Sequence, residues 1–160
     1  MSDSKLVINF SRTVDHEALD YYFKHVIRKA ILATLVHEGF EMDAEVAITF
    51  CDNAYIKKLN RKYRKKNSAT DVLSFPMYDF SAGDEPDLIE GELVTLGDIV
   101  ISLERAEAQA KELGNTFLEE VAFLTVHSVL HLLGYDHERS AEDDEMQCAA
   151  QREIMNTLDI

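Results

Sequence analysis

The segment Thr116–Leu133 constrains the fold of this chain most, because it has the pattern of a helix that is apolar on nearly every side. Thr116 and Glu119 have the spacing of a capping box, which predicts the start of this helix, and Gly134 predicts its end. A helix without a polar stripe has to be buried. We therefore expect this helix to be buried.

The length of the chain, 160 residues, supports a single domain spanning residues 1–160. Its hydrophobic fraction of 46% is that of a soluble globular protein rather than a disordered one. We find no secretory signal and no apolar run long enough to cross a membrane. The cysteines, Cys51 and Cys148, form no CxxC pair. These features predict a cytoplasmic protein that does not bind membranes.

The alternation of β-rich and amphipathic segments predicts an α+β fold (α/β-like), with a four-stranded mixed sheet and about five helices. The expected strands are Leu6–Phe10, Glu45–Phe50, Thr70–Met77 and Leu93–Ser102. The expected helices run from a cap within Thr13–Asp15 to Gly39, from Asp52, from Ser102 to Leu113, over Thr116–Leu133 and from Ser140. We expect an exposed acidic loop from Asp79 to Glu92, a possible break at Gly97, and a stripe of Met146, Ala150, Ile154 and Leu158 on the last helix. Pro76 predicts an edge position or a strand end.

The charges are distributed unevenly along the chain. The segment from Asn53 to Thr70 contains seven Lys and Arg and no acidic residue, although the chain as a whole carries a net charge of −14. Such a basic element on an acidic body is typical of a site that attracts a polyanion. The alternative is a helix face that is merely solvated. The residues that we expect to contact the phosphates or other anionic groups of such a partner are Lys58, Arg61, Lys62, Arg64 and Lys65.

Three histidines form the pattern HxxxHxxGxxH. His127 and His131 are four residues apart and lie on one face of the buried helix, while Gly134 allows a sharp turn that brings His137 back to the pair. Three imidazoles with an open fourth position are the ligand set of a catalytic zinc site. The sequence therefore predicts one Zn²⁺ per chain, bound in a metzincin-like site at the end of the helix.

The same ligand frame occurs in the metzincin proteases, which place a glutamate after the first histidine as the general base. This chain has Ser128 there, so the protease interpretation loses its base. Asp136 is a candidate for a substitute base, for a partner in the second shell of a ligating imidazole, or simply for the N-cap of the last helix.

The segments HSVLHLLGYDH (His127–His137), TDVLSFP (Thr70–Pro76) and LGDIVIS (Leu96–Ser102) resemble the bacterial YbeY family of rRNA maturation endoribonucleases. The resemblance spans the whole chain. It departs from the family at Ser128, where the family commonly has glycine, although a small residue is kept.

This resemblance implies a zinc-dependent, single-strand-specific endoribonuclease that acts on the 3′ end of the small-subunit (16S) rRNA and in ribosome quality control. Its partners would be single-stranded RNA, rRNA and the small ribosomal subunit. It also implies that the family's functional arginine is Arg64, in the Tyr63-Arg64 step, whereas the basic run alone does not separate Arg64 from Arg61. We therefore expect Arg64 and His127 to be catalytic.

Several mechanistic alternatives stay open. The zinc ion would polarise a phosphoryl oxygen or activate water, and either water or the 2′-hydroxyl of the RNA would attack. A metal-dependent hydrolase of a peptide or small ester is a second interpretation. A ribosome-associated protein with a purely structural zinc is a third, and it predicts that metal removal unfolds the chain.

Overall fold

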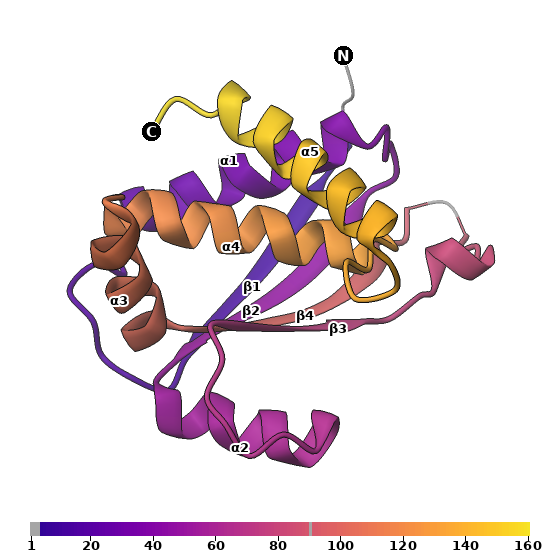
Figure 1. Cartoon of the computed structure of the whole chain (residues 1–160). Helices are drawn as coiled ribbons and strands as arrows, with labels where there is room; N and C mark the ends of the chain where they lie inside the picture. Colours follow the sequence, from indigo (N-terminus) through magenta and orange to yellow (C-terminus); the bar gives the residue numbers. More distant parts are fainter. Residues whose placement is uncertain (1–3, 90) are drawn as a thin grey trace.

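The chain folds into one mixed sheet with helices on both faces (Figure 1), and the computed structural model describes residues 4–89 and 91–160. The strands are β1 (Leu6–Arg12), β2 (Ala44–Cys51), β3 (Val72–Pro76) and β4 (Val94–Ser102). The helices are α1 (Tyr21–His37), α2 (Asn53–Arg64), α3 (Leu103–Leu113), α4 (Phe117–Leu132) and α5 (Ala141–Thr157), with a short 3₁₀ helix η1 (Phe80–Ala82). In the described ranges these are the four strands and five helices that the sequence predicts, so the single-domain α+β fold class is confirmed.

The order of the strands across the sheet is β1-β2-β4-β3. Strand β2 pairs in parallel with both β1 and β4, while β3 pairs antiparallel with β4 and forms an edge of the sheet. Pro76 is the last residue of this edge strand, where its missing N–H removes no central hydrogen bond.

Helices α1 and α4 cover one face of the sheet and α5 packs on their far side, while α2 covers the other face and α3 lies at one end (Figure 1). The main core packs apolar residues of α1 and α4 onto the strands. A second cluster joins α1, α4 and α5 on the far side of α4. The predicted burial of α4 is therefore confirmed, and burial on both sides explains its apolar sequence. Among the large apolar residues of α4, Phe123 is the most exposed, with 37% of its surface accessible.

Helix α1 begins later than the sequence predicts. The N-cap is Asp20, whose carboxylate accepts a hydrogen bond from the N–H of Phe23 at 2.8 Å. The residues within Thr13–Asp15 do not cap the helix, because Thr13 still follows β1 and donates its N–H to the carbonyl of Phe50 at 3.0 Å. The predicted start was therefore wrong: Thr13 still pairs with β2, and bends and a turn over residues 13–18 precede the helix.

The buried face of α5 also differs from the predicted stripe. It consists of Gln147, Ala150, Gln151 and Ile154, whereas Met146 is 58% exposed. Residues spaced by four throughout drift around the helix by roughly 40° at each step, so the predicted row could not stay on one face. The buried residues have the i, i+3, i+4, i+7 spacing that keeps side chains on one face of a helix, here the face that packs against α1 and α4.

Strand β4 continues through Gly97 and is not broken there. Its pairing register with β2 shifts between Glu45 and Val46, because Leu96 is an additional residue that forms a bulge. None of the helices in the described residues is long and apolar enough to span a membrane.

Candidate active site

The three histidines of the predicted motif come from the C-terminal end of α4 and from the turn that follows it. His127 and His131 lie one turn apart on α4. The helix ends in a Schellman turn, in which the N–H groups of Gly134 and Tyr135 bond back to carbonyls of the last turn at 3.1 and 3.0 Å. Gly134 has a φ of +114°, which a glycine adopts easily. This turn brings His137 back toward the helix.

All three histidines line one cleft with a volume of about 470 Å³. Its other walls come from the end of α2, from β3 and from the loop after α4. The other lining residues are Arg64, Thr70, Asp71, Val72, Leu73, Ser74, Asp136 and Glu138. The rings of His127 and His137 are 5.1 Å apart between their centroids. The structure therefore brings the predicted histidines together with Arg64.

Burial keeps two of these imidazoles in their neutral form. It lowers the pKa of His127 and of His131 below the usual value, and the charge of His137 lowers both further, although the hydrogen bond with Gln151 opposes the shift of His127. A neutral imidazole has one lone pair to offer as a ligand or as a base. In His127, Nδ1 lies 2.6 Å from Oε1 of Gln151, so Nε2 is the nitrogen without this contact.

A finished metal site is not formed. In the part of the chain that the structure describes, no group of three or more His, Cys, Asp or Glu side chains is arranged so that it could hold a metal ion. The type and protonation of the donors fit zinc, since neutral imidazoles are preferred zinc ligands, but the side chains do not enclose an ion as they lie. The predicted ligand set of His127, His131 and His137 therefore stays a prediction.

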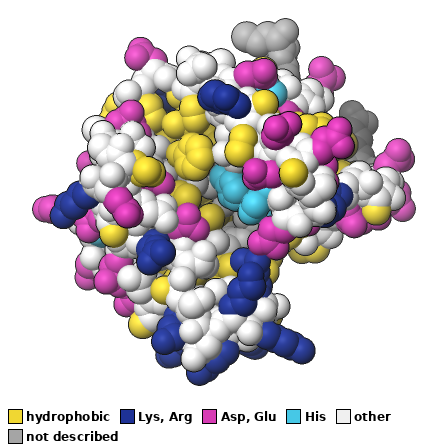
Figure 2. All heavy atoms as spheres, viewed as in Figure 1, with side chains coloured by type: hydrophobic (Ala, Val, Ile, Leu, Met, Phe, Trp, Pro, Cys, Tyr) yellow, Lys and Arg dark blue, Asp and Glu magenta, His cyan; other side chains and the backbone are white. Residues whose placement is uncertain are grey.

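Arg64 is the last residue of α2 and projects into this cleft. Its Nη2 donates to Oε1 of Glu138 at 3.0 Å, so the arginine bridges from α2 to the loop that carries His137. Figure 2 shows Lys and Arg side chains gathered over α2, next to the exposed histidines. The other predicted RNA-binding residues are exposed near this helix and do not line the cleft; they are Lys58, Arg61, Lys62 and Lys65.

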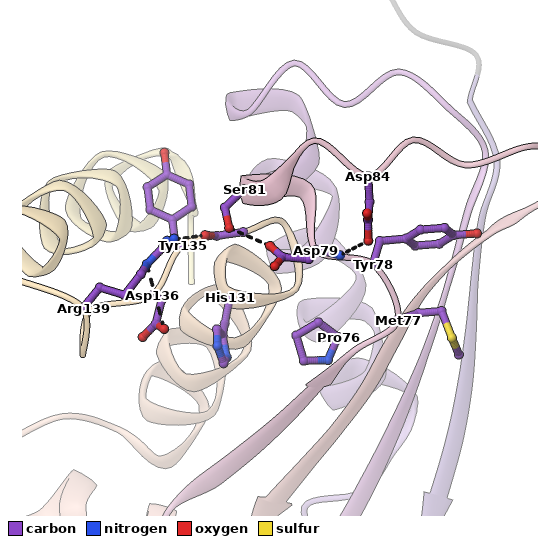
Figure 3. A pocket seen from close by; sticks show the side chains of 11 residues that line it. Pro76, Met77, Tyr78, Asp79, Ser81, Asp84, His131, Tyr135, Asp136 and Arg139 are labelled. Carbon is purple, nitrogen blue, oxygen red and sulfur yellow. Dashed lines mark hydrogen bonds and ion pairs between the residues drawn. The ribbon is translucent and has the colours of Figure 1, made fainter.

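Asp136 lies where the histidine cleft meets a second hollow. This hollow, of about 520 Å³, is also lined by His131 and by residues that follow β3. Figure 3 shows Asp136 on one side of the His131 ring and Pro76 on the other. The Oδ1 atom of Asp136 accepts the N–H of Glu138 at 3.0 Å. The N-cap of α5 is Ser140, so the capping alternative for Asp136 is wrong.

The second hollow has an acidic lining. Besides Asp136 it contains the carboxylates of Asp79 and Asp84, and its basic residue is Arg139 (Figure 3). Arg139 is already engaged, because its Nη2 donates to the carbonyl of Gly134 at 2.7 Å. The two sides of the histidines therefore differ in charge, with the basic helix α2 on one side and this acidic hollow on the other.

Sequence analysis missed three residues that the fold brings to the histidines. Asp71 lines the cleft from the start of β3, and its Oδ1 accepts the N–H of Val72 at 2.8 Å. Glu138 pairs with Arg64, and Gln151 contacts His127. Asp71 lies within the TDVLSFP segment, which could have pointed to it, whereas no local pattern marks Gln151.

The chain is similar over most of its length to known proteins. Residues 9–159 match the family model described as Endoribonuclease YbeY. A protein named Endoribonuclease YbeY from Clostridium botulinum (strain Loch Maree) is 48% identical over 147 residues, which cover 84% of this chain and 86% of that protein. One of the same name from Clostridium acetobutylicum is 42% identical over 155 residues, covering 89% and 92%.

A solved structure supports the same relationship. The solution structure of a Thermotoga maritima protein matches with a TM-score of 0.54 and 26% identity, covering 94% of this chain and 91% of that one. The sequence matches and the fold point to the same family. In the structure, residues of HSVLHLLGYDH and of TDVLSFP line the same cleft. The chain therefore belongs to the YbeY family of endoribonucleases.

Proposed function

We propose that this chain is a zinc-dependent endoribonuclease that cleaves single-stranded RNA. Its substrate in the cell would be rRNA, at the 3′ end of the small-subunit rRNA, and it would act in the cytoplasm in ribosome maturation and quality control. The observation that carries this proposal is that Arg64 and the three histidines line one cleft at the end of the basic helix α2.

His127, His131 and His137 would hold one Zn²⁺ per chain. When bound, this ion supplies Lewis acidity toward a phosphoryl oxygen of the RNA. Two observations support the ligand set: His127 and His131 are held neutral by burial, and Nδ1 of His127 is engaged with Gln151. Asp136 borders the same cleft, where it would orient a histidine or accept a proton.

The residues of the chain would bind the RNA from two directions. Arg64 has a planar guanidinium that can contact two phosphate oxygens and stays charged, so it suits the charge that develops at the scissile phosphate. The flanking phosphates would lie against Lys58, Arg61, Lys62 and Lys65, which are exposed. An extended strand of RNA would fit along β3, because β3 is an edge strand and Ser74 lines the cleft.

The test is cleavage of an end-labelled single-stranded RNA by the wild-type protein and by His131→Ala, purified in parallel. His25→Ala is the matched control, because His25 is exposed on α1. We expect the wild type and His25→Ala to cut and His131→Ala to be inactive. Equal cutting by all three would identify a contaminating nuclease, and no cutting by the wild type would overturn the proposed activity.

The rRNA substrate needs its own measurement. We expect the wild type to shorten precursor small-subunit rRNA within isolated ribosomal subunits to a defined 3′ end, and His131→Ala to leave it unchanged. Cleavage of free RNA at many positions, with no defined end on subunits, would keep the nuclease and overturn its proposed role in rRNA maturation.

A further inference from the structure

Helix α5 turns two glutamines toward α4 at the position of His127. Gln147 and Gln151 are only 1% and 6% exposed, although most of α5 is polar and faces solvent. Burying an amide side chain is unfavourable unless it is hydrogen-bonded. Oε1 of Gln151 lies 2.6 Å from Nδ1 of His127, and Nε2 of Gln147 lies 3.4 Å from the carbonyl oxygen of the same residue. Both amides therefore meet at His127.

The contact with Gln151 determines which nitrogen of the ring carries the proton. An amide oxygen only accepts hydrogen bonds, and a neutral imidazole has one N–H donor and one bare nitrogen. With the Gln151 amide oriented so that Oε1 faces the ring at 2.6 Å, a bare Nδ1 would place two lone pairs against each other, so in this arrangement Nδ1 donates. The lone pair of His127 is then on Nε2.

Gln147 does not oppose this assignment. Its Nε2 is 3.2 Å from Nδ1 of His127, but a nitrogen that donates to Gln151 cannot also accept from Gln147. The acceptor for Gln147 is therefore the carbonyl oxygen of His127. The two glutamines thus have different hydrogen-bond partners, since Gln151 accepts from the ring and Gln147 donates to the backbone carbonyl.

We propose that Gln151 is a positioning residue, which holds His127 as the tautomer protonated on Nδ1 so that Nε2 presents its lone pair to the cleft. The use of that lone pair as a zinc ligand rests on the proposed function. The tautomer itself does not, because it follows from a contact within the metal-free chain. A partner that fixes the other nitrogen of a ligating histidine typically raises metal affinity.

The test is a long-range ¹H–¹⁵N correlation spectrum of the metal-free, ¹⁵N-labelled protein at about pH 8.5, where imidazoles are neutral. We expect His127 to be protonated on Nδ1 in the wild type and to lose this preference in Gln151→Leu, which has no acceptor. Gln151→Glu keeps an acceptor and should keep the tautomer. Gln147→Leu is the matched control and should also keep it. A wild-type His127 protonated on Nε2 would overturn the inference, even where Gln151→Leu does not fold.

Zinc affinity, measured by competition with a chromophoric chelator, separates this inference from the proposed function. We expect Gln151→Leu to bind Zn²⁺ about 10- to 100-fold more weakly than the wild type, and Gln151→Glu to recover most of the loss. A wild type with the expected tautomer and no zinc binding would leave the positioning role in place and overturn the proposed metal. Unchanged zinc affinity in Gln151→Leu would overturn the contribution of Gln151 to metal binding.

Discussion

Arg64 and Glu138 form an ion pair across the candidate active site, with Nη2 and Oε1 3.0 Å apart. Arg64 is the last residue of α2 and Glu138 directly follows His137. The pair therefore connects the basic helix to the loop that carries His137. If Arg64 binds the RNA as we propose, a phosphate of the RNA has to replace Glu138 at the guanidinium. In the free protein, Glu138 already pairs with the guanidinium that we expect to bind the substrate.

Glu138→Gln should therefore improve RNA binding. Both side chains are partly exposed, at 35% for Arg64 and 57% for Glu138, so the pair is worth at most about 1 kcal/mol. Its loss should lower KM by roughly two- to fivefold. Cleavage kinetics on one RNA at low salt measure this, with Glu142→Gln on α5 as the control. A higher KM for Glu138→Gln would mean that Glu138 positions Arg64 rather than competing for it.

Arg64→Ala should lower kcat by about 100-fold or more if the guanidinium stabilises the charge that develops during cleavage. Arg64→Lys should recover little, because an ammonium cannot make the planar two-point contact with phosphate oxygens. Arg105→Ala, at an exposed position on α3, is the control. An Arg64→Lys enzyme with wild-type kcat would reduce the role of this residue to that of a simple positive charge.

Local spacing predicted those parts of the fold and site that neighbouring residues encode. The capping box of Thr116 and Glu119 is formed, with both reciprocal hydrogen bonds present, and the helix ends beside Gly134 as expected. The histidine pattern also depends on spacing within one helix and one turn. For that reason His127 and His131 could be placed on one face before the fold was known.

The parts that the sequence did not predict depend on which elements pack together. Gln151 looks like an ordinary polar residue of a solvated helix, and only the packing of α5 onto α4 brings it to His127. Glu138 reaches Arg64 across 74 positions of sequence, and Asp71 enters the cleft because β3 occupies the sheet edge. No periodic pattern records such distant contacts.

RNA cleavage should depend steeply on salt. Each phosphate contact on a single strand contributes a slope of roughly −0.7 to the logarithm of the binding constant against the logarithm of salt concentration. Replacing Lys58, Arg61, Lys62 and Lys65 by glutamine should therefore flatten the slope by up to about 3. The same number of substitutions at Lys24, Lys29, Lys111 and Arg152 should leave it unchanged. If the salt dependence has the same slope in both variants, the RNA does not bind along α2.

Gly97→Ala should destabilise the sheet where β4 pairs with β3, the strand that lines the cleft. Gly97 has a φ of +143°, and a Cβ there would lie 2.2 Å from the backbone oxygen of Phe75 in β3. We expect the free energy of unfolding to fall by about 3 kcal/mol or more. In the control, Gly83→Ala, φ is +89° and nothing lies within 4 Å of the new Cβ, so only about 1–2 kcal/mol of backbone strain is expected. If urea unfolding shows the same loss of unfolding free energy in Gly97→Ala and Gly83→Ala, the close approach of the Phe75 backbone to Gly97 is contradicted.

His37 should make stability depend on pH. Hydrogen bonds to Glu153 and to Glu38, both at 2.7 Å, raise the pKa of His37 above its usual 6.5. Because the folded pKa is the higher one, the stabilisation is complete below about pH 6.5 and is lost as the pH rises through the folded value. The free energy of unfolding of the wild type should therefore be higher than that of Glu153→Gln at pH 6, and the two should be equal at pH 9. Glu145→Gln, the control on the same helix, should show no such difference, and a gap that persists at pH 9 would exclude His37 as its source.

Metal removal should inactivate the protein without unfolding it. The main core lies between the sheet and helices α1 and α4, and none of its residues is a histidine of the cleft. A ligand at 100 times its Kd adds about 2.7 kcal/mol to stability, which corresponds to roughly 5–10 °C in Tm for a chain of this length. We therefore expect a chelator to abolish cleavage and lower Tm by that amount, with circular dichroism unchanged at 25 °C. Zinc should restore both properties. Loss of the helical signal on chelation would instead favour the structural-zinc interpretation, in which the ion holds the fold and the protein acts as a ribosome-associated factor.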